Sequence, residues 1–149
     1  MKATALVGIG VFVGATALGA AQALQRINPQ GLSTPQTYSH VVRAGKTVYL
    51  AGQVGANAKG VVAGPGMKEQ VEQVMSNLGT ALKSQGLDAS HVAKINVYVT
   101  SIDEFRAPDV AAIRTKFFGD NRPASTLVQV VRLADPGYKV EIEAIAIAP

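Results

Sequence analysis

The fold of this protein is decided by residues 66–100, which read GMKEQVEQVMSNLGTALKSQGLDASHVAKINVYVT. Through residues 67–82 the apolar side chains recur every three or four positions, and Gly86 follows as a stop signal, so this part predicts an amphipathic helix. From residue 92 to residue 100 apolar and polar residues alternate, which predicts a strand with one buried face. A helix leading into a half-buried strand is typical of a layered domain in which helices cover a sheet.

The residues before this stretch have the character of short strands. Residues 38–43 and 47–53 are β-rich and flank Ala44-Gly45, which predicts a hairpin. Residues 59–63 are the expected third strand.

The residues after it predict one more helix and two more strands. Val110, Ile113 and Phe117 have helical spacing, with Pro108 suited to the first turn. Two strand-like runs follow, at residues 125–133 and 138–147, with turn-forming residues between them. The predicted order is therefore βββαβαββ, which makes an α+β domain with a mixed sheet of about six strands and both helices on one face.

The last predicted strand indicates what covers the opposite face of the sheet. Ile145 and Ile147 share one side of that strand with Glu141 and Glu143, so this side is apolar at one end and charged at the other. An exposed face of this kind predicts contact with another subunit.

Composition excludes several classes of function. The chain has 149 residues, no cysteine and two histidines, so disulfide frameworks, thiolate nucleophiles and cysteine zinc sites are excluded, and most histidine-built metal sites are disfavoured. The net charge is +4, but the basic residues are scattered singly, which gives no reason to expect a nucleic-acid partner. No motif for a metal or cofactor is present in the sequence, and none is expected.

The N-terminal residues differ from the rest of the chain. Residues 1–23 have a basic start at Lys2, an apolar middle and a small-residue exit, which predicts a signal peptide cleaved after Ala23. A membrane anchor and a buried helix are the alternatives, but the repeated glycines disfavour a permanent span. We therefore expect a periplasmic or secreted protein without a stable membrane anchor. Residues 24–37 are expected to form an extended arm and residues 38–149 the domain.

Several short motifs, in order along the chain, resemble the RidA/YjgF family. They are residues 37–45 (TYSHVVRAG), 48–53 (VYLAGQ), 117–119 (FFG), 123–126 (PAST), 130–133 (VVRL) and 140–146 (VEIEAIA). The resemblance implies a chorismate-mutase-like fold, a homotrimer with the open sheet faces at its centre, and a small-molecule cleft at each subunit boundary. It also implies metal-free and cofactor-free hydrolysis of enamines or imines to a keto acid and ammonia.

The resemblance places functional residues at matching positions of this chain. Tyr38 stands at the position of a ligand-contacting tyrosine, and Glu141 at that of the glutamate that orients the attacking water. Gly52 matches a glycine of the cleft, where it would let backbone approach a ligand.

The chain departs from the family where a carboxylate-binding arginine is implied. Ser125 stands at that position, and a hydroxyl in place of a charge-assisted pair weakens binding by about 1.5 to 3 kcal/mol. Ala111 also replaces a polar residue implied for the second helix. Arg122 and Arg114 are the candidates to take over this role, and a solvated surface arginine is the alternative for each.

The sequence and the resemblance together leave three candidate functions. The first is weak or altered hydrolysis of a C=N compound, in which Glu141 orients water while Tyr38, Gly52, Ser125 and Arg122 surround the ligand. The second is a trimer that binds a small molecule without chemistry, which the loss of the arginine favours. The third is a ribonuclease, for which the sequence has neither paired histidines nor a basic stripe with aromatic residues.

Overall fold

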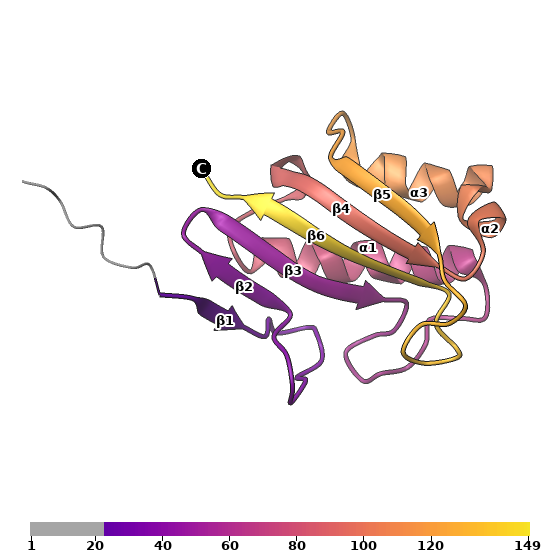
Figure 1. Ribbon diagram of the computed structural model, residues 1–149, viewed down its shortest axis with the longest axis horizontal. Helices are drawn as coiled ribbons and strands as arrows, with labels where there is room; N and C mark the ends of the chain where they lie inside the picture. The colour runs from indigo at the N-terminus through magenta and orange to yellow at the C-terminus, as the bar shows by residue number, and fades with distance from the viewer. Residues whose placement is uncertain (1–22) are drawn as a thin grey trace, which may run out of the picture.

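The computed structural model describes residues 23–149 and contains one mixed sheet with helices on one side (Figure 1). The strands are β1 (Gln25–Ile27), β2 (Val41–Ala44), β3 (Thr47–Val54), β4 (Val92–Val99), β5 (Ala124–Gln129) and β6 (Val140–Ile147). The helices are α1 (Met67–Lys83), α2 (Ile102–Arg106) and α3 (Pro108–Phe118), with a short 3-10 turn, η1, at Ala89–His91. The strand order is β1-β2-β3-β6-β4-β5, and only β4 and β5 pair in parallel. The predicted α+β class and the mixed sheet are confirmed.

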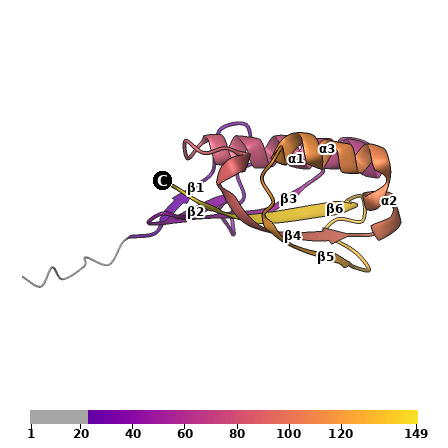
Figure 2. The ribbon, with the colours of Figure 1, turned by 90° about the horizontal axis from the view of Figure 1, so that it is seen from above.

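The two longer helices form a single layer on the sheet. Figure 2 shows α1 and α3 side by side over one face, and no helix of the described residues covers the other face. The predicted apolar stripe of α1 is buried along its whole length, where it contacts β3 and β6: Met67, Val71, Val74, Met75, Leu78 and Leu82. Each such side chain contributes roughly 1.5 to 3 kcal/mol through removal from water, so this stripe anchors the fold.

Strand β6 lies at the centre of the sheet and alternates between its two faces. Val140, Ile142, Ala144 and Ala146 are buried under the helices. The intervening residues Glu141, Glu143, Ile145 and Ile147 lie on the open face, as predicted. The apolar end of this face remains accessible, since Ile147 is 45% exposed.

The predicted third strand is wrong, although the sheet does contain a further strand on the N-terminal side. Residues 59–63 form a loop because Asn57 Oδ1 accepts hydrogen bonds from the backbone N–H groups of Lys59 (2.9 Å) and Val61 (3.2 Å). Its β-type pairing is limited to one isolated antiparallel bridge, between Val62 and Ala56 just before the loop. The extra strand is β1, which forms within the predicted arm and pairs with β2 at the sheet edge.

The last two strands follow one another in sequence but are not neighbours in the sheet. β6 lies between β3 and β4, at the centre of the sheet. Its helix-facing residues are all buried, as this central position requires. β5 is largely exposed and forms the edge beyond β4, to which it is parallel as expected for a connection through helices.

The connection from β4 to β5 contains one helix more than predicted. The hydroxyl of Ser101 caps the five-residue helix α2 by accepting a hydrogen bond from the backbone N–H of Glu104. Only Phe105 of α2 is buried, so the segment has no apolar periodicity by which to recognise it.

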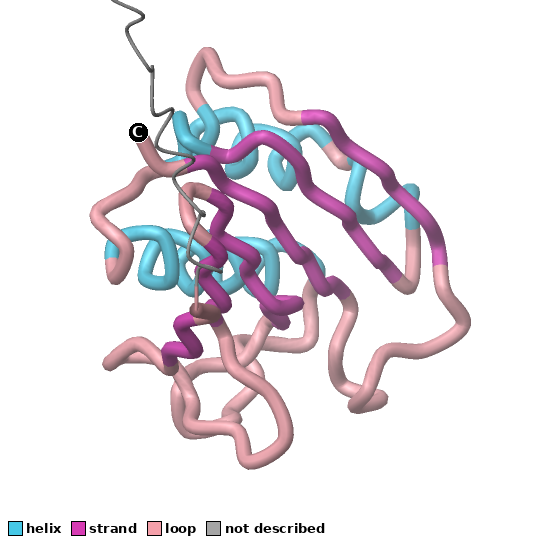
Figure 3. Tube along the Cα trace, turned by 60° about the vertical axis from the view of Figure 1, so that its left-hand side comes forward, coloured by secondary structure: helices cyan, strands magenta, loops and turns pink. Residues whose placement is uncertain are grey.

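The loops that follow β3 and precede β6 gather at one end of the sheet (Figure 3). Gln70 holds two of them together, because its side-chain Nε2 donates to the carbonyl oxygens of Gly64 (2.9 Å) and Gly137 (2.8 Å). The predicted signal peptide lies outside the described residues apart from its last alanine, Ala23. Within residues 23–149, no helix has the length and apolar character needed to cross a membrane.

Candidate functional site

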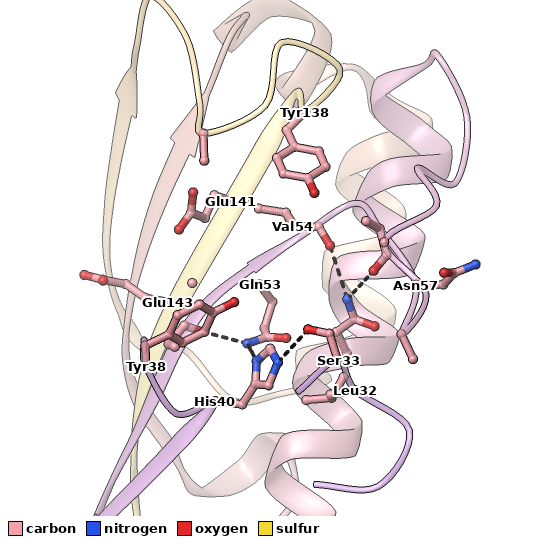
Figure 4. A pocket seen from close by; sticks show the side chains of 17 residues that line it. Leu32, Ser33, Tyr38, His40, Gln53, Val54, Asn57, Tyr138, Glu141 and Glu143 are labelled. Atoms are coloured by element: carbon pink, nitrogen blue, oxygen red, sulfur yellow. Dashed lines mark hydrogen bonds between the residues drawn. The ribbon is translucent and has the colours of Figure 1, made fainter. Parts of the chain in front are cut away.

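A cavity of about 580 Å³ opens where these loops meet β3 and β6 (Figure 4). Tyr38, Gly52 and Glu141 all line it, although they come from three separate parts of the chain. We call it the Glu141 cavity. Its walls also include Ser33, His40, Gln53, Asn57, Tyr138 and Glu143.

A β-bulge shapes the wall that carries Glu141. The register between β3 and β6 shifts between Leu50 and Gln53, so the Ala51-Gly52 segment bulges away from regular pairing. A Cβ atom on Gly52 would lie 2.7 Å from Cδ of Glu141 and 2.8 Å from its Cγ, and closer still to the carboxylate. Gly52 therefore makes room for the glutamate side chain, a role that the sequence alone did not indicate.

Glu141 and Glu143 differ in their surroundings although both face this cavity. Glu143 Oε1 accepts hydrogen bonds from Asn96 Nδ2 and from the hydroxyl of Tyr98 (3.3 Å). Within residues 23–149 no cation pairs with Glu141. Burial raises the pKa of Glu141, and the nearby charge of Glu143 raises it further. Glu141 is thus the less restrained of the two carboxylates, and burial favours its protonated form.

A buried hydrogen-bonded chain supports the floor of the cavity. Gln53 Nε2 donates to the carbonyl oxygen of Ala51 (2.9 Å) and to Nδ1 of His40 (3.1 Å), and His40 Nε2 lies 3.1 Å from the hydroxyl of Ser33. A carbonyl only accepts, so the Gln53 atom between them is a donor and His40 Nδ1 must accept. His40 is therefore neutral with its proton on Nε2, and burial lowers its pKa, against a smaller opposing effect of the Ser33 backbone.

Two tyrosine rings flank the opening. Tyr38 is 51% exposed and packs edge-on against His40, with 5.5 Å between the ring centroids. Tyr138 is half-buried, and Figure 4 shows its hydroxyl directed into the cavity. Burial raises the pKa of Tyr138, and Asp135, Tyr38 and Glu141 add to the effect. Sequence reasoning missed Tyr138, because it starts the last strand-like run and has no distinguishing pattern.

Ser125 and Arg122 lie elsewhere, in a second cavity of about 340 Å³. Ser125 is paired with Ile95, whose side chain faces the helices, whereas Glu141 is paired with Tyr98 on the open face. The hydroxyl and the carboxylate are therefore on opposite faces of one sheet. Because Arg114 of α3 also lines this second cavity, we call it the Arg114 cavity.

The Glu141 cavity combines one proton-accepting carboxylate with phenol groups and an uncharged histidine. Such a set can orient and deprotonate a water molecule beside a small bound ligand. In the part of the chain that the structure describes, no three His, Asp or Glu side chains are grouped so as to hold a metal ion.

Comparisons with known proteins show which family this chain belongs to. A family model described as endoribonuclease L-PSP matches residues 29–148. The human protein named 2-iminobutanoate/2-iminopropanoate deaminase is 35% identical over 111 residues, which are 74% of this chain and 79% of the human protein.

Two solved structures share the fold. A member of the conserved Rid family, YyfA from Yersinia pestis, has a TM-score of 0.78 and 27% identity, covering 85% of this chain and 100% of its own. RidA from the Antarctic bacterium Psychrobacter sp. PAMC 21119 has a TM-score of 0.72 and 31% identity, covering 82% of this chain and 99% of its own. With the sheet order, the motifs and these matches together, the chain belongs to the endoribonuclease L-PSP family, also called RidA/YjgF.

Proposed function

We propose that this protein hydrolyses a small 2-imino acid, or a related C=N compound, in clefts completed by a second copy of the chain. The observation that carries the proposal is the Glu141 carboxylate, seated over Gly52 without a protein cation and with its pKa raised by burial and by Glu143. A carboxylate with a raised pKa is a stronger base than an ordinary glutamate, which suits it to proton transfer. The name of the human relative, a 2-iminobutanoate/2-iminopropanoate deaminase, supports the substrate class.

The proposed reaction consumes one water molecule. The water oxygen bonds to the imine carbon while Glu141 accepts one water proton, and the C=N electron pair moves to nitrogen. Glu141 passes this proton to the nitrogen, which gives a carbinolamine. Glu141 next takes the hydroxyl proton and delivers it to the departing nitrogen, the C–N bond breaks, and a 2-oxo acid and ammonia result. Both water protons end on nitrogen, so no cofactor is needed.

The phenol groups have binding roles in this proposal. Tyr38 and Tyr138 donate hydrogen bonds to the substrate or to the attacking water, from opposite sides of Glu141 in Figure 4. The neutral state of His40 keeps a positive charge out of the cavity, which preserves the basicity of the carboxylate.

The assembly in this proposal is a homotrimer. Its support is the open sheet face, where Tyr49, Ile147 and Val128 remain 47%, 45% and 40% exposed. Apolar side chains gathered on one uncovered face favour contact with other copies of the chain. A second copy would also bring a Ser125 surface toward Glu141, which one chain cannot do across its own sheet.

Export is part of the proposal and rests on the pattern of residues 1–23. Mass spectrometry of the protein from its native host tests it. A mature terminus at Leu24 supports export, and an intact Met1 in the soluble cytoplasmic fraction would refute it.

Turnover of a freshly generated 2-imino acid tests the activity. We expect wild type to accelerate ammonia release and Glu141→Gln to lower the rate by about 100- to 10,000-fold, the usual range for loss of a general base. Glu72→Gln, which changes an exposed glutamate on α1, is the matched control and should keep the wild-type rate. Equal rates for wild type and Glu141→Gln would remove this residue from the mechanism.

The two other functions make different predictions in the same assay. A protein that only binds would release no ammonia from any imine yet would still retain the ligand. A ribonuclease is disfavoured because His40 is buried within its hydrogen bonds and His91 pairs with Asp88 in a different part of the structure.

A further inference from the structure

We propose that the Arg114 cavity binds the carboxylate of a small, short-chain organic acid, with the Arg114 guanidinium as the principal cation. That the acid is the 2-imino acid of the reaction rests on the proposed function; that the cavity takes a carboxylate rests on its own residues.

The cavity has an apolar floor and a basic rim. It lies between α3 and the parallel strands β4 and β5, on the helix side of the sheet. Ile95, Val97, Phe105 and Phe118 supply the apolar surface, and no aspartate or glutamate of the described residues lines it. The charged groups are Arg114 and Arg122, so the local charge is positive.

Arg114 is held in place, but no anion of the described residues pairs with it. Its guanidinium lies over the ring of Phe105, 3.7 Å from the ring centroid, which fixes its position through a cation–π contact. Burial lowers the pKa of Arg114, and the like charge of Arg106 lowers it further, although a guanidinium stays protonated.

Two acidic residues of α2 and α3 are already paired with lysines, and Asp120, six positions after Arg114, is exposed and does not line the cavity. Asp109 pairs with Lys68 at 3.7 Å, and Glu104 pairs with Lys139 at 3.0 Å. Within residues 23–149 none of the ion pairs includes Arg114. A half-buried cation without a counter-ion is stabilised by any anion that enters the cavity.

The neighbouring polar groups divide into occupied and available donors. Arg122 is anchored at the rim, because its Nη1 donates to the carbonyl oxygens of Gly119 (2.6 Å) and Asn121 (3.1 Å). The Asn121 amide is occupied with the carbonyl oxygens of Ala89 and Val92. Ser125 is exposed at the cavity and offers a hydroxyl. Ser125 is also where the resemblance implies an arginine, and in this proposal Arg114 supplies that cation from the facing helix.

This combination suits the carboxylate of a small acid. A guanidinium matches the two oxygens of a carboxylate with two parallel hydrogen bonds, and the hydroxyl adds a third donor. The apolar floor suits a short hydrocarbon chain, and the volume of about 340 Å³ suits a small acid.

Calorimetric titration of the purified protein with 2-oxobutanoate, a stable 2-oxo acid, tests the proposal. We expect Arg114→Gln to weaken binding by about 10- to 100-fold, the effect of losing a charge-assisted pair. The affinity of Arg114→Lys should be intermediate, because a lysine keeps the positive charge but cannot form two parallel hydrogen bonds to one carboxylate. Arg26→Gln, an exposed arginine on β1 at the far edge of the sheet, is the matched control and should bind as wild type does.

A rescue variant separates lost binding from lost folding. Ser125→Arg in the Arg114→Gln background should restore affinity to within a few-fold of wild type, because it returns a guanidinium to the same cavity from the opposite wall. Butanone, which lacks the carboxylate, should bind no variant measurably.

Three results would overturn the proposal: no binding of 2-oxobutanoate to wild type, equal affinity for wild type and Arg114→Gln, or tighter binding of inorganic phosphate than of 2-oxobutanoate. Arg114-dependent binding without imine turnover would sustain this inference while refuting the proposed reaction. Imine turnover that is unchanged in Arg114→Gln would refute this inference while sustaining the proposed reaction.

Discussion

The Glu141 cavity and the Arg114 cavity are opposites in charge and in the way their ionised groups are held. Among residues 23–149, Glu141 is a carboxylate without a paired cation, and it lies beside a β-bulge. In the same residues Arg114 is a guanidinium without a paired anion, and it stacks on an aromatic ring. The sheet separates the two, since the Glu141 and Ser125 positions face opposite sides. In the proposed function, each cavity supplies the charged group that the other lacks.

This separation has a physical basis. A glutamate and an arginine within contact distance in one chain would pair, which would depress the pKa of the carboxyl and weaken it as a base. With the sheet between them, burial and Glu143 keep the pKa of Glu141 raised. The two groups would then meet only around a substrate, at the boundary between two copies of the chain.

Of the substitutions considered below, the one at Gly52 should have the largest effect, and it should affect only the Glu141 cavity. In Gly52→Ala, the new Cβ overlaps the side chain of Glu141 and forces it out of its seat. We expect turnover of the imine to fall by about 100-fold, because a displaced base loses its alignment with water. Binding of 2-oxobutanoate at the Arg114 cavity should change little. Wild-type turnover in Gly52→Ala would show that the seat of Glu141 is unimportant.

The two glutamates of the Glu141 cavity should differ in their effect on stability. Glu143→Gln weakens charge-assisted hydrogen bonds from Asn96 and Tyr98 and should lower the free energy of unfolding by about 1 to 2 kcal/mol. Glu141→Gln removes a carboxylate that is costly to ionise where it lies, so its melting temperature at pH 7 should equal or exceed that of wild type.

The direction of the expected stability change in Glu141→Gln follows from proton linkage. The folded-state pKa of Glu141 is raised above the usual 4.5, so the folded protein holds a proton that the unfolded chain releases, and this contribution is lost as pH rises through the folded value. Thermal melts of both variants across pH 4.5 to 8 measure it. A Glu141→Gln variant less stable than Glu143→Gln at pH 7 would contradict the assignment of the two roles.

The smallest expected effect is the contribution of His40 to the pH dependence of the free energy of unfolding. Its folded-state pKa is lowered below 6.5, so the unfolded chain takes up a proton first as pH falls. Stability is therefore complete above 6.5 and should drop by less than about 1 kcal/mol between pH 7.5 and 6. Urea unfolding of wild type and His40→Gln at these pH values measures the difference, which should vanish in the variant. A pH-independent wild type would mean that His40 is not held neutral.

The parts of the fold that sequence could predict are those with local periodicity. The apolar stripe of α1 repeats over four turns, and β4 alternates from Ile95 to Val99, so both were predictable from spacing alone. The start of β4 departs from the predicted alternation, because a register shift between Val92 and Lys94 buries Val92 and exposes Ala93. By contrast, β1 is three residues long and exists only because it pairs with β2. The loop at residues 59–63 is decided by one side chain, Asn57, whose hydrogen bonds compete with strand pairing.

The candidate site was predictable only in part for the same reason. Tyr38 and Glu141 are far apart in the chain, and only the family resemblance suggested that they lie together, as they do in one cavity. The seat that Gly52 provides depends on a bulge that pairing with β6 creates. The position of Arg114 depends on a contact with Phe105 from a helix too short to be recognised in the sequence.

Subunit mixing tests most directly whether two copies of the chain share one site. Glu141→Gln lacks the proposed base and Arg114→Gln the proposed cation, so each alone should turn over the imine more slowly than wild type at low substrate concentration. The two variants are unfolded together and refolded, which mixes the chains within the proposed trimer. If one chain supplies Glu141 and its neighbour supplies Arg114, about a quarter of the clefts in a random 1:1 mixture will carry both native residues. Imine turnover should then recover to about a quarter of the wild-type rate. Recovery no greater than the average of the two separate variants would contradict a site divided between two copies.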